Sequence, residues 1–117
     1  MSRVGDTKNK GYVYLLCNLS EDRVYKIGVT RGSIDKRIKK LQTGSSGEIM
    51  LVKKWETNIP FYIEGALHRK YGSNNVLNEW YCLSDDEVNK FHETCQEIEN
   101  MAEALKDNPF FKYDKLK

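Results

Sequence analysis

Several features that define other protein classes are missing from this 117-residue sequence. No apolar run approaches the roughly 18–20 residues that a membrane-spanning helix requires. The first ten residues are polar and lack the apolar core of a secretory signal peptide. The sequence also contains no internal repeat and no low-complexity stretch. We therefore expect a globular protein that is not secreted, has no membrane partner and works in the cytoplasm.

Cysteine is scarce, and its arrangement excludes two further classes. The three cysteines are Cys17, Cys82 and Cys95, an odd number without CxxC spacing. His68 and His92 do not complete a recognisable zinc pattern with them. We expect reduced, partly buried thiols, and neither a disulfide framework nor structural zinc.

The charge is unevenly distributed along a chain of otherwise ordinary composition. The length suits one domain, which we place at residues 11–105 between a flexible N-terminus (1–10) and a C-terminal tail (106–117). Residues 1–71 contain fourteen Lys and Arg against seven Asp and Glu, whereas the remainder contains five against ten. A basic half is typical of a protein that binds a polyanion, although it could also be a solvated surface, and the acidic half could dock a protein.

The order of strand and helix patterns predicts an α+β fold. Ser33 and Gly44 suit the two ends of one helix, Asn58 and Pro60 suit the start of a second, and Ser84 opens a third through a capping box with Glu87. The expected fold is a small three-stranded antiparallel sheet flanked by helices, with a long C-terminal helix. The predicted elements are a hairpin of strands 11–17 and 24–30, a helix at 34–43, a strand at 48–56, a helix at 60–71, a polar loop at 72–78, an extended piece at 79–83 and a helix at 85–105.

The hairpin presents the first candidate functional residues. Because strand residues alternate between faces, the apolar sets Val13/Leu15/Cys17 and Tyr25/Ile27/Val29 should enter the core together. This leaves Tyr14 and Lys26 on the opposite face, beside Gly28, where a ligand could approach the backbone closely. Alternatively, Tyr14 is an ordinary packing residue of the strand.

The helix at 34–43 adds positively charged candidates. Ile34, Ile38 and Leu41 form its apolar stripe, so the neighbouring Arg37 should emerge at the border between helix and sheet. An arginine there could bind a phosphate through two hydrogen bonds or form a structural ion pair. The expected phosphate-facing or solvated surface consists of Arg31, Lys36, Lys39 and Lys40.

A carboxylate interrupts the apolar stripe of the helix at 60–71. Glu64 shares this stripe with Phe61, and His68 lies one turn further along the same side. An unpaired charge is costly there, so Glu64 requires a cationic partner, either a metal ion or a basic side chain such as Arg37 in a structural salt bridge. Gly65, placed in mid-helix, indicates a close approach by another group.

Together these motifs resemble the GIY-YIG endonuclease superfamily, and most closely its phage and large-DNA-virus branch. The resemblance covers about residues 11–83. The motifs that carry it, in order, are Val13-Tyr14, Lys26 to Thr30, Arg37 to Gly44, Glu64 to His68, and Glu79-Trp80.

This resemblance implies a phosphodiesterase that uses one divalent metal, Mg²⁺ or Mn²⁺, to cut nucleic acid, DNA more than RNA. By position, Glu64 matches the metal ligand, while Tyr14 and Arg37 match catalytic residues. His68 and Glu79 match branch-specific positions, His68 with a catalytic role. Such a protein could work alone, as a homodimer or in a larger host or viral complex, including at a nuclear or viral replication site. The alternatives are a catalytically silent nucleic-acid-binding module and a protein-interaction domain.

Two positions depart from the superfamily pattern. Lys26 stands where the superfamily has a tyrosine, with Tyr25 one place earlier as a possible substitute. We expect Lys26 to be catalytic by lowering the pKa of Tyr14 as a general base. The superfamily's later asparagine has three candidates, Asn74, Asn75 and Asn78.

Overall fold

The sheet is built on the predicted hairpin, which is formed by β1 (Gly11–Asn18) and β2 (Val24–Thr30). β3 (Ile49–Thr57) pairs with β1 on its other side, which completes the three antiparallel strands that the sequence predicts. This computed structural model describes residues 10–106. The expected flexible N-terminus and C-terminal tail therefore lie outside the described residues, except for Lys10 and Lys106.

Two short strands extend the sheet beyond the three predicted strands, and the second of them confirms the extended piece predicted at 79–83. β5 (Trp80–Cys82) pairs with β2, and β4 (Asn75–Leu77) pairs with β5, which gives the order β3-β1-β2-β5-β4. The predicted polar loop at 72–78 is thus wrong in part, because Asn75–Leu77 form a strand after the 3₁₀ turn of Gly72–Asn74. All three side chains of β4 are exposed, so the strand has no alternating pattern that a sequence could reveal.

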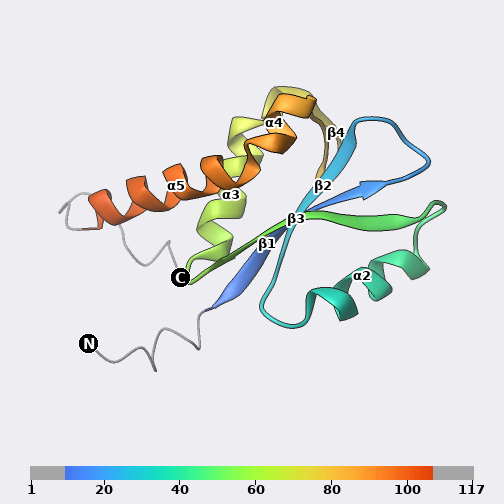
Figure 1. Cartoon of the computed structure of the whole chain (residues 1–117), viewed down its shortest axis with the longest axis horizontal. Coiled ribbons are helices and arrows are strands. Elements are labelled where there is room, and N and C mark those ends of the chain that lie inside the picture. The colour runs from blue at the N-terminus through green and yellow to red at the C-terminus, as the bar shows by residue number, and fades with distance from the viewer. Residues whose placement is uncertain (1–9, 107–117) are drawn as a thin grey trace.

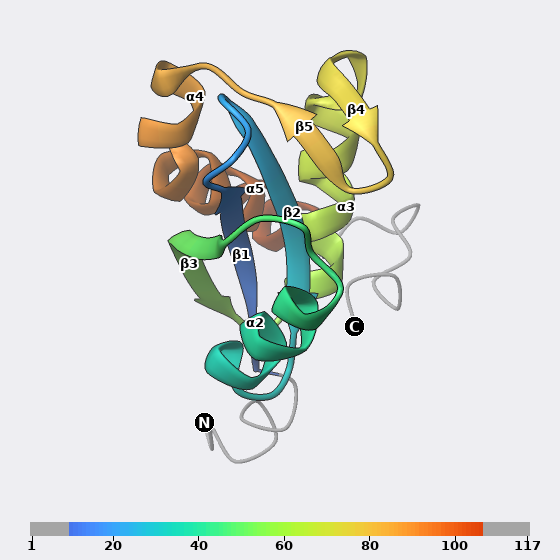
Figure 2. The same ribbon diagram turned by 90° about the vertical axis from the view of Figure 1, so that its right-hand side faces the viewer.

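Helices cover both faces of the sheet (Figure 1). α3 (Pro60–Lys70), α4 (Asp85–Asn89) and α5 (Phe91–Leu105) lie on one face, and α2 (Ile34–Thr43) lies on the other, as the perpendicular view in Figure 2 also shows. The α+β class with an antiparallel sheet, flanking helices and a long C-terminal helix is confirmed.

The alternation in β1 and β2 predicts one core face, which the structure confirms, and a second apolar cluster lies on the opposite face. The larger cluster contains Val13, Leu15, Ile27 and Val29, which pack against α3 and α5. The smaller cluster, under α2, is formed by Tyr14, Leu16 and Ile49 with Ile38, Leu41 and Trp80. Burial in the larger cluster raises the pKa of the Cys95 thiol to about 12, which is consistent with a reduced cysteine.

One predicted helix is divided in two, and one predicted helix start has a different capping residue. The helix expected at 85–105 is interrupted at Lys90, whose ψ of 9° separates α4 from α5. Val88 before the break and Phe91 after it are both buried. The spacing of apolar residues therefore continues across the break, and the sequence pattern does not indicate it. α3 begins at Pro60, as predicted, but its N-cap is Ile59 rather than Asn58, and no side chain caps it through a hydrogen bond. Thr57 accepts the Ile59 N–H instead, at 3.1 Å.

None of the helices within residues 10–106 is both long enough and apolar enough to cross a membrane.

Candidate functional site

Tyr14 lies buried under α2, with its ring held against the backbone of β2. In the β1–β2 register Tyr14 stands opposite Gly28. A Cβ atom added at Gly28 would lie 2.5 Å from the Tyr14 hydroxyl oxygen and 2.6 Å from two ring carbons. Gly28 is therefore required by the tyrosine ring, whereas the sequence suggested that a ligand occupies this space.

The backbone of Ile27 anchors the rest of the site at the edge of β2. β5 pairs with β2 only over Val24, Tyr25 and Lys26. At the next residue, the Ile27 N–H donates to the carbonyl of Glu79 at 3.1 Å. The Ile27 carbonyl lies 3.1 Å from Nε2 of His68. A single residue of β2 thus fixes both the hairpin turn that carries Glu79 and the α3 face that carries His68.

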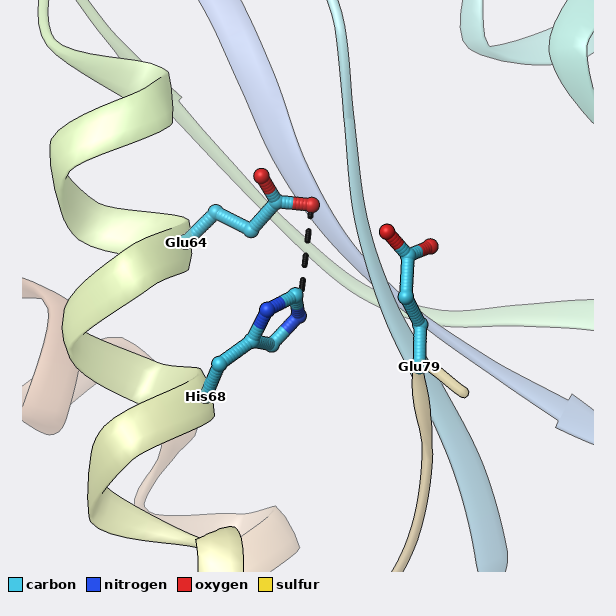
Figure 3. A group of neighbouring side chains, drawn as sticks. All are labelled: Glu64, His68 and Glu79. Carbon is cyan, nitrogen blue, oxygen red and sulfur yellow. Dashed lines mark ion pairs between the residues drawn. The ribbon is translucent and has the colours of Figure 1, made fainter. Parts of the chain in front are cut away.

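Glu64, His68 and Glu79 converge at this edge. Figure 3 shows Glu64 and His68 reaching from α3 toward Glu79, which comes from the opposite side. One ligand atom from each residue lies within 4.8 Å of the others. All three residues are partly buried, so the group faces solvent without being fully hydrated.

The charge on Glu64 is only weakly compensated within the protein. Burial raises the pKa of its carboxyl group, and Glu79 adds to the increase, while His68, Lys26 and Arg37 oppose it. The ion pair that the structure gives Glu64 is with Nε2 of His68, at 3.9 Å. A strong structural salt bridge would lower the pKa. The structure therefore disfavours the salt-bridge alternative for Glu64.

The hydrogen bond of His68 determines which ring nitrogen carries a proton. A carbonyl oxygen only accepts, so Nε2–H of His68 donates to Ile27. The imidazole also stacks on Tyr81, with ring centroids 5.4 Å apart. His68 is thus oriented from two sides, and its Nε2 could bind a metal only by giving up the bond to Ile27.

Lys26 pairs with Glu79, which changes the role expected for it. Its Nζ lies 3.1 Å from Oε1 of Glu79 and 5.8 Å from the centre of the Trp80 ring. The expected lowering of the Tyr14 pKa is wrong, because burial raises that pKa and the nearby Glu79 and Glu64 add to the increase. Arg37 is the cation that counteracts this increase.

Arg37 lies where the helix pattern places it, at the border of α2. Its side chain is half-buried, and it lowers the pKa of both Tyr14 and Glu64. The guanidinium group is therefore within electrostatic range of both residues, although they come from different elements. Tyr14, Lys26, Arg37, Glu64, His68 and Glu79 are thus brought together by the fold.

The predicted phosphate-facing residues lie outside this group. The side chains of Lys36, Lys39 and Lys40 belong to exposed residues of α2, next to Arg37. Arg31 precedes the helix, and its guanidinium lies 5.2 Å from the centre of the Phe61 ring. None of the electrostatic contacts of Tyr14 and Glu64 involves these four cations.

Tyr25 does not join the site. It packs against the larger core cluster with α3 and α5, on the face of β2 opposite Lys26. Burial and the nearby Asp85 raise its pKa. Tyr25 is next to Lys26 in the sequence, but its side chain lies on the other face of β2 and does not replace the superfamily tyrosine in the site.

Asn75, one of the three candidates for the superfamily's asparagine, positions the turn that carries Glu79. Its Nδ2 donates to the carbonyls of Asn78, at 2.7 Å, and Trp80, at 3.1 Å. Asn78 adopts a positive φ of 53° in the same turn. These contacts hold the β4–β5 turn in which Glu79 lies.

The donor atoms of the group suit a divalent metal ion. Carboxylate oxygens are the ligands that Mg²⁺ and Mn²⁺ prefer, and imidazole also binds Mn²⁺. Burial raises the pKa of Glu64 although His68, Lys26 and Arg37 oppose the increase, so a bound cation would favour its ionised form. The group of Glu64, His68 and Glu79 could therefore bind a metal.

Comparison with known proteins identifies the family to which this site belongs. Residues 11–98 match the T5orf172 domain. None of the curated proteins and none of the solved structures compared with the chain matches it. The match spans all five motifs of the sequence and all six residues that the fold brings together. The chain therefore belongs to the T5orf172 domain family, which is related to the GIY-YIG domains.

Proposed function

We propose that this protein is a metal-dependent endonuclease that hydrolyses phosphodiester bonds, with DNA as the favoured substrate. The convergence of Glu64, His68 and Glu79 beside Tyr14 and Arg37 carries this proposal. Family membership supports a nuclease-like activity. The resemblance to the phage and large-DNA-virus branch favours DNA over RNA.

In this proposal the two carboxylates hold Mg²⁺ or Mn²⁺. When bound, the ion would neutralise charge on the phosphate and help to activate water. Glu64 is the principal ligand because its carboxylate is otherwise weakly compensated. Glu79 is the second ligand, and Lys26 holds it in place at 3.1 Å. His68 carries a proton on Nε2, which could pass to the leaving oxygen once the bond to the Ile27 carbonyl is given up.

Arg37 and Tyr14 act on the phosphate and on the attacking water. Arg37 stabilises the negative charge that builds up on the phosphoryl oxygens during hydrolysis. Burial keeps the Tyr14 phenol protonated at neutral pH, so Tyr14 orients the water through its hydroxyl group. Proton removal from the water then falls to another group of the site.

The decisive experiment is cleavage of supercoiled, linear and branched DNA, and of RNA, in Mg²⁺ or Mn²⁺ with a chelator control. We expect metal-dependent products from the wild type and none from Glu64→Ala, because the mutant lacks the main metal ligand. Glu48→Ala, which removes an exposed carboxylate outside the site, should cut normally. Nucleic-acid binding without metal should survive in both variants.

The same assay separates the alternatives. Binding without cleavage in the wild type would contradict the nuclease and indicate a silent binding module. Absence of nucleic-acid binding would leave the protein-interaction domain, with the acidic α4 and α5 as its surface.

A further inference from the structure

A groove lies next to the metal group, on the α2 side of the sheet. Its volume is about 580 Å³, within the range of small-molecule sites. Leu16, Ile49 and Leu41 line it from the smaller core cluster, and Val76 and Leu77 line it from β4. The nuclease chemistry described above uses none of these five side chains.

Trp80 and Lys26 connect the groove to the metal group. Trp80 lines the groove and directly follows Glu79 in the chain. Lys26 also lines it, between the Trp80 ring and the Glu79 carboxylate that it contacts. A molecule in the groove would therefore touch the same two elements that position the metal ligand.

The chemistry of the groove combines apolar side chains with flanking cations. Val76 is 55% exposed and Leu77 is 64% exposed, although both are apolar. The charged lining of the groove consists of Lys26, Lys40 and Glu21, two cations against one carboxylate. A nucleobase has a flat, weakly polar face that stacks on aromatic side chains, and it is attached to phosphates that lysines attract. A base that is paired and stacked in a duplex does not offer this face.

We propose that the groove binds an unpaired nucleobase next to the phosphate that is cut, with Trp80 as its stacking surface. This inference rests on the proposed nuclease function and specifies its substrate class, which is nucleic acid with an unpaired or extruded nucleotide at the cleavage point. Paired duplex must expel a base to enter the groove, and this costs free energy.

Binding in EDTA tests the groove without cleavage. The probes are a single-stranded oligonucleotide and an abasic strand of the same length, which keeps the phosphates and lacks the bases. Stacking on an aromatic residue is worth about 5- to 150-fold in affinity per base. We expect the wild type to prefer the normal strand by a factor in this range and Trp80→Leu to lose the preference.

If Trp80→Leu fails to fold, two variants of exposed residues still test the groove. Leu77→Ser changes the groove at a side chain that is 64% exposed, so the fold should tolerate it. Met101→Ser is the matched control, because Met101 is 63% exposed and lies on α5, on the other face of the sheet. Leu77→Ser should weaken the preference for bases, and Met101→Ser should keep it.

Fluorescence provides a direct readout of stacking. The chain has two tryptophans, so Trp55→Phe leaves Trp80 as the reporter. Single strands and duplexes with one unpaired base should quench Trp80, whereas abasic strands and fully paired duplexes should not. Equal wild-type affinity for normal and abasic strands, or absence of quenching, would overturn the proposal even if the protein cuts DNA. Quenching in a protein that never cuts would support the groove and contradict the nuclease.

Discussion

At the scale of single residues, Gly28 leaves the space that the Tyr14 ring occupies. A Cβ at this position would overlap the Tyr14 ring at 2.5–2.6 Å. Gly28→Ala should therefore displace the hydroxyl group and slow cleavage about 100-fold, the usual effect of a misplacement of about 1 Å. Overpacking should also lower the free energy of unfolding by about 1–3 kcal/mol. Rate assays and denaturant unfolding would measure the two effects.

Gly72→Ala is the control for this variant, because a Cβ at Gly72 would meet no atom within 4 Å. It should cut at the wild-type rate. A Gly28→Ala protein with full activity would show that the position of Tyr14 does not matter for catalysis.

The charge of Glu64 has a second, thermodynamic consequence. Burial raises the pKa of Glu64, so the ionised carboxylate costs stability above that pKa. Glu64→Gln should therefore have a higher free energy of unfolding than the wild type at neutral pH without metal. This difference should disappear as the pH falls through the Glu64 pKa, because the wild-type carboxyl group then becomes protonated. A metal at ten times its Kd should stabilise the wild type by about 1.4 kcal/mol and leave Glu64→Gln unchanged.

Thermal unfolding with EDTA and with Mg²⁺ or Mn²⁺ measures both effects. A Glu64→Gln protein that is less stable than the wild type in EDTA would instead indicate a structural ion pair at Glu64.

At the scale of elements, α3 contains a glycine that its own packing does not require. The nearest atom to a Cβ at Gly65 would be a terminal nitrogen of Arg69, at 3.4 Å, which is the end of a flexible side chain. The close approach that the sequence suggested is therefore absent within the described residues. Gly65→Ala should raise the free energy of unfolding by about 1 kcal/mol, the difference in helix propensity.

Ala66→Gly, one residue along the same helix, should lower the free energy of unfolding by about the same amount. Both variants should cut normally. A loss of cleavage in the more stable Gly65→Ala would mean that the substrate approaches α3 at this position.

At the scale of the whole molecule, one basic helix and two acidic helices lie on opposite faces of the sheet. The basic α2 lies on one face, and the acidic α4 and α5 lie on the other (Figure 1). Nucleic acid should therefore approach from the α2 side, and its affinity should fall with salt by about 0.9 in log–log slope per phosphate contact on duplex DNA. Replacing Lys36, Lys39 and Lys40 by Ala should flatten this slope.

Lys90→Ala, on the acidic face, is the matched control and should leave the salt slope unchanged, because Lys90 pairs with Asp86 at 3.4 Å. Titrations at several salt concentrations would show the difference. An unchanged slope in the triple variant would show that nucleic acid binds to a surface other than α2.

Local patterns in the sequence were sufficient for most elements and for the choice of faces. The alternation in β1 and β2 correctly placed Tyr14 and Lys26 opposite the main core. The apolar period of α2 correctly placed Ile38 and Leu41 against the sheet. Such patterns suffice because a side chain's face follows from the geometry of its own strand or helix.

Contacts between distant segments were decided only by the tertiary structure. The exposed β4 has no pattern of its own, yet its turn brings Glu79 to Glu64 and Lys26. For Tyr14, the sequence could predict its face but not the sign of its pKa shift. That sign depends on how burial compares with Arg37 and two carboxylates from other elements. Local sequence determines where a side chain points, whereas its charge environment is the sum of neighbours that only folding brings together.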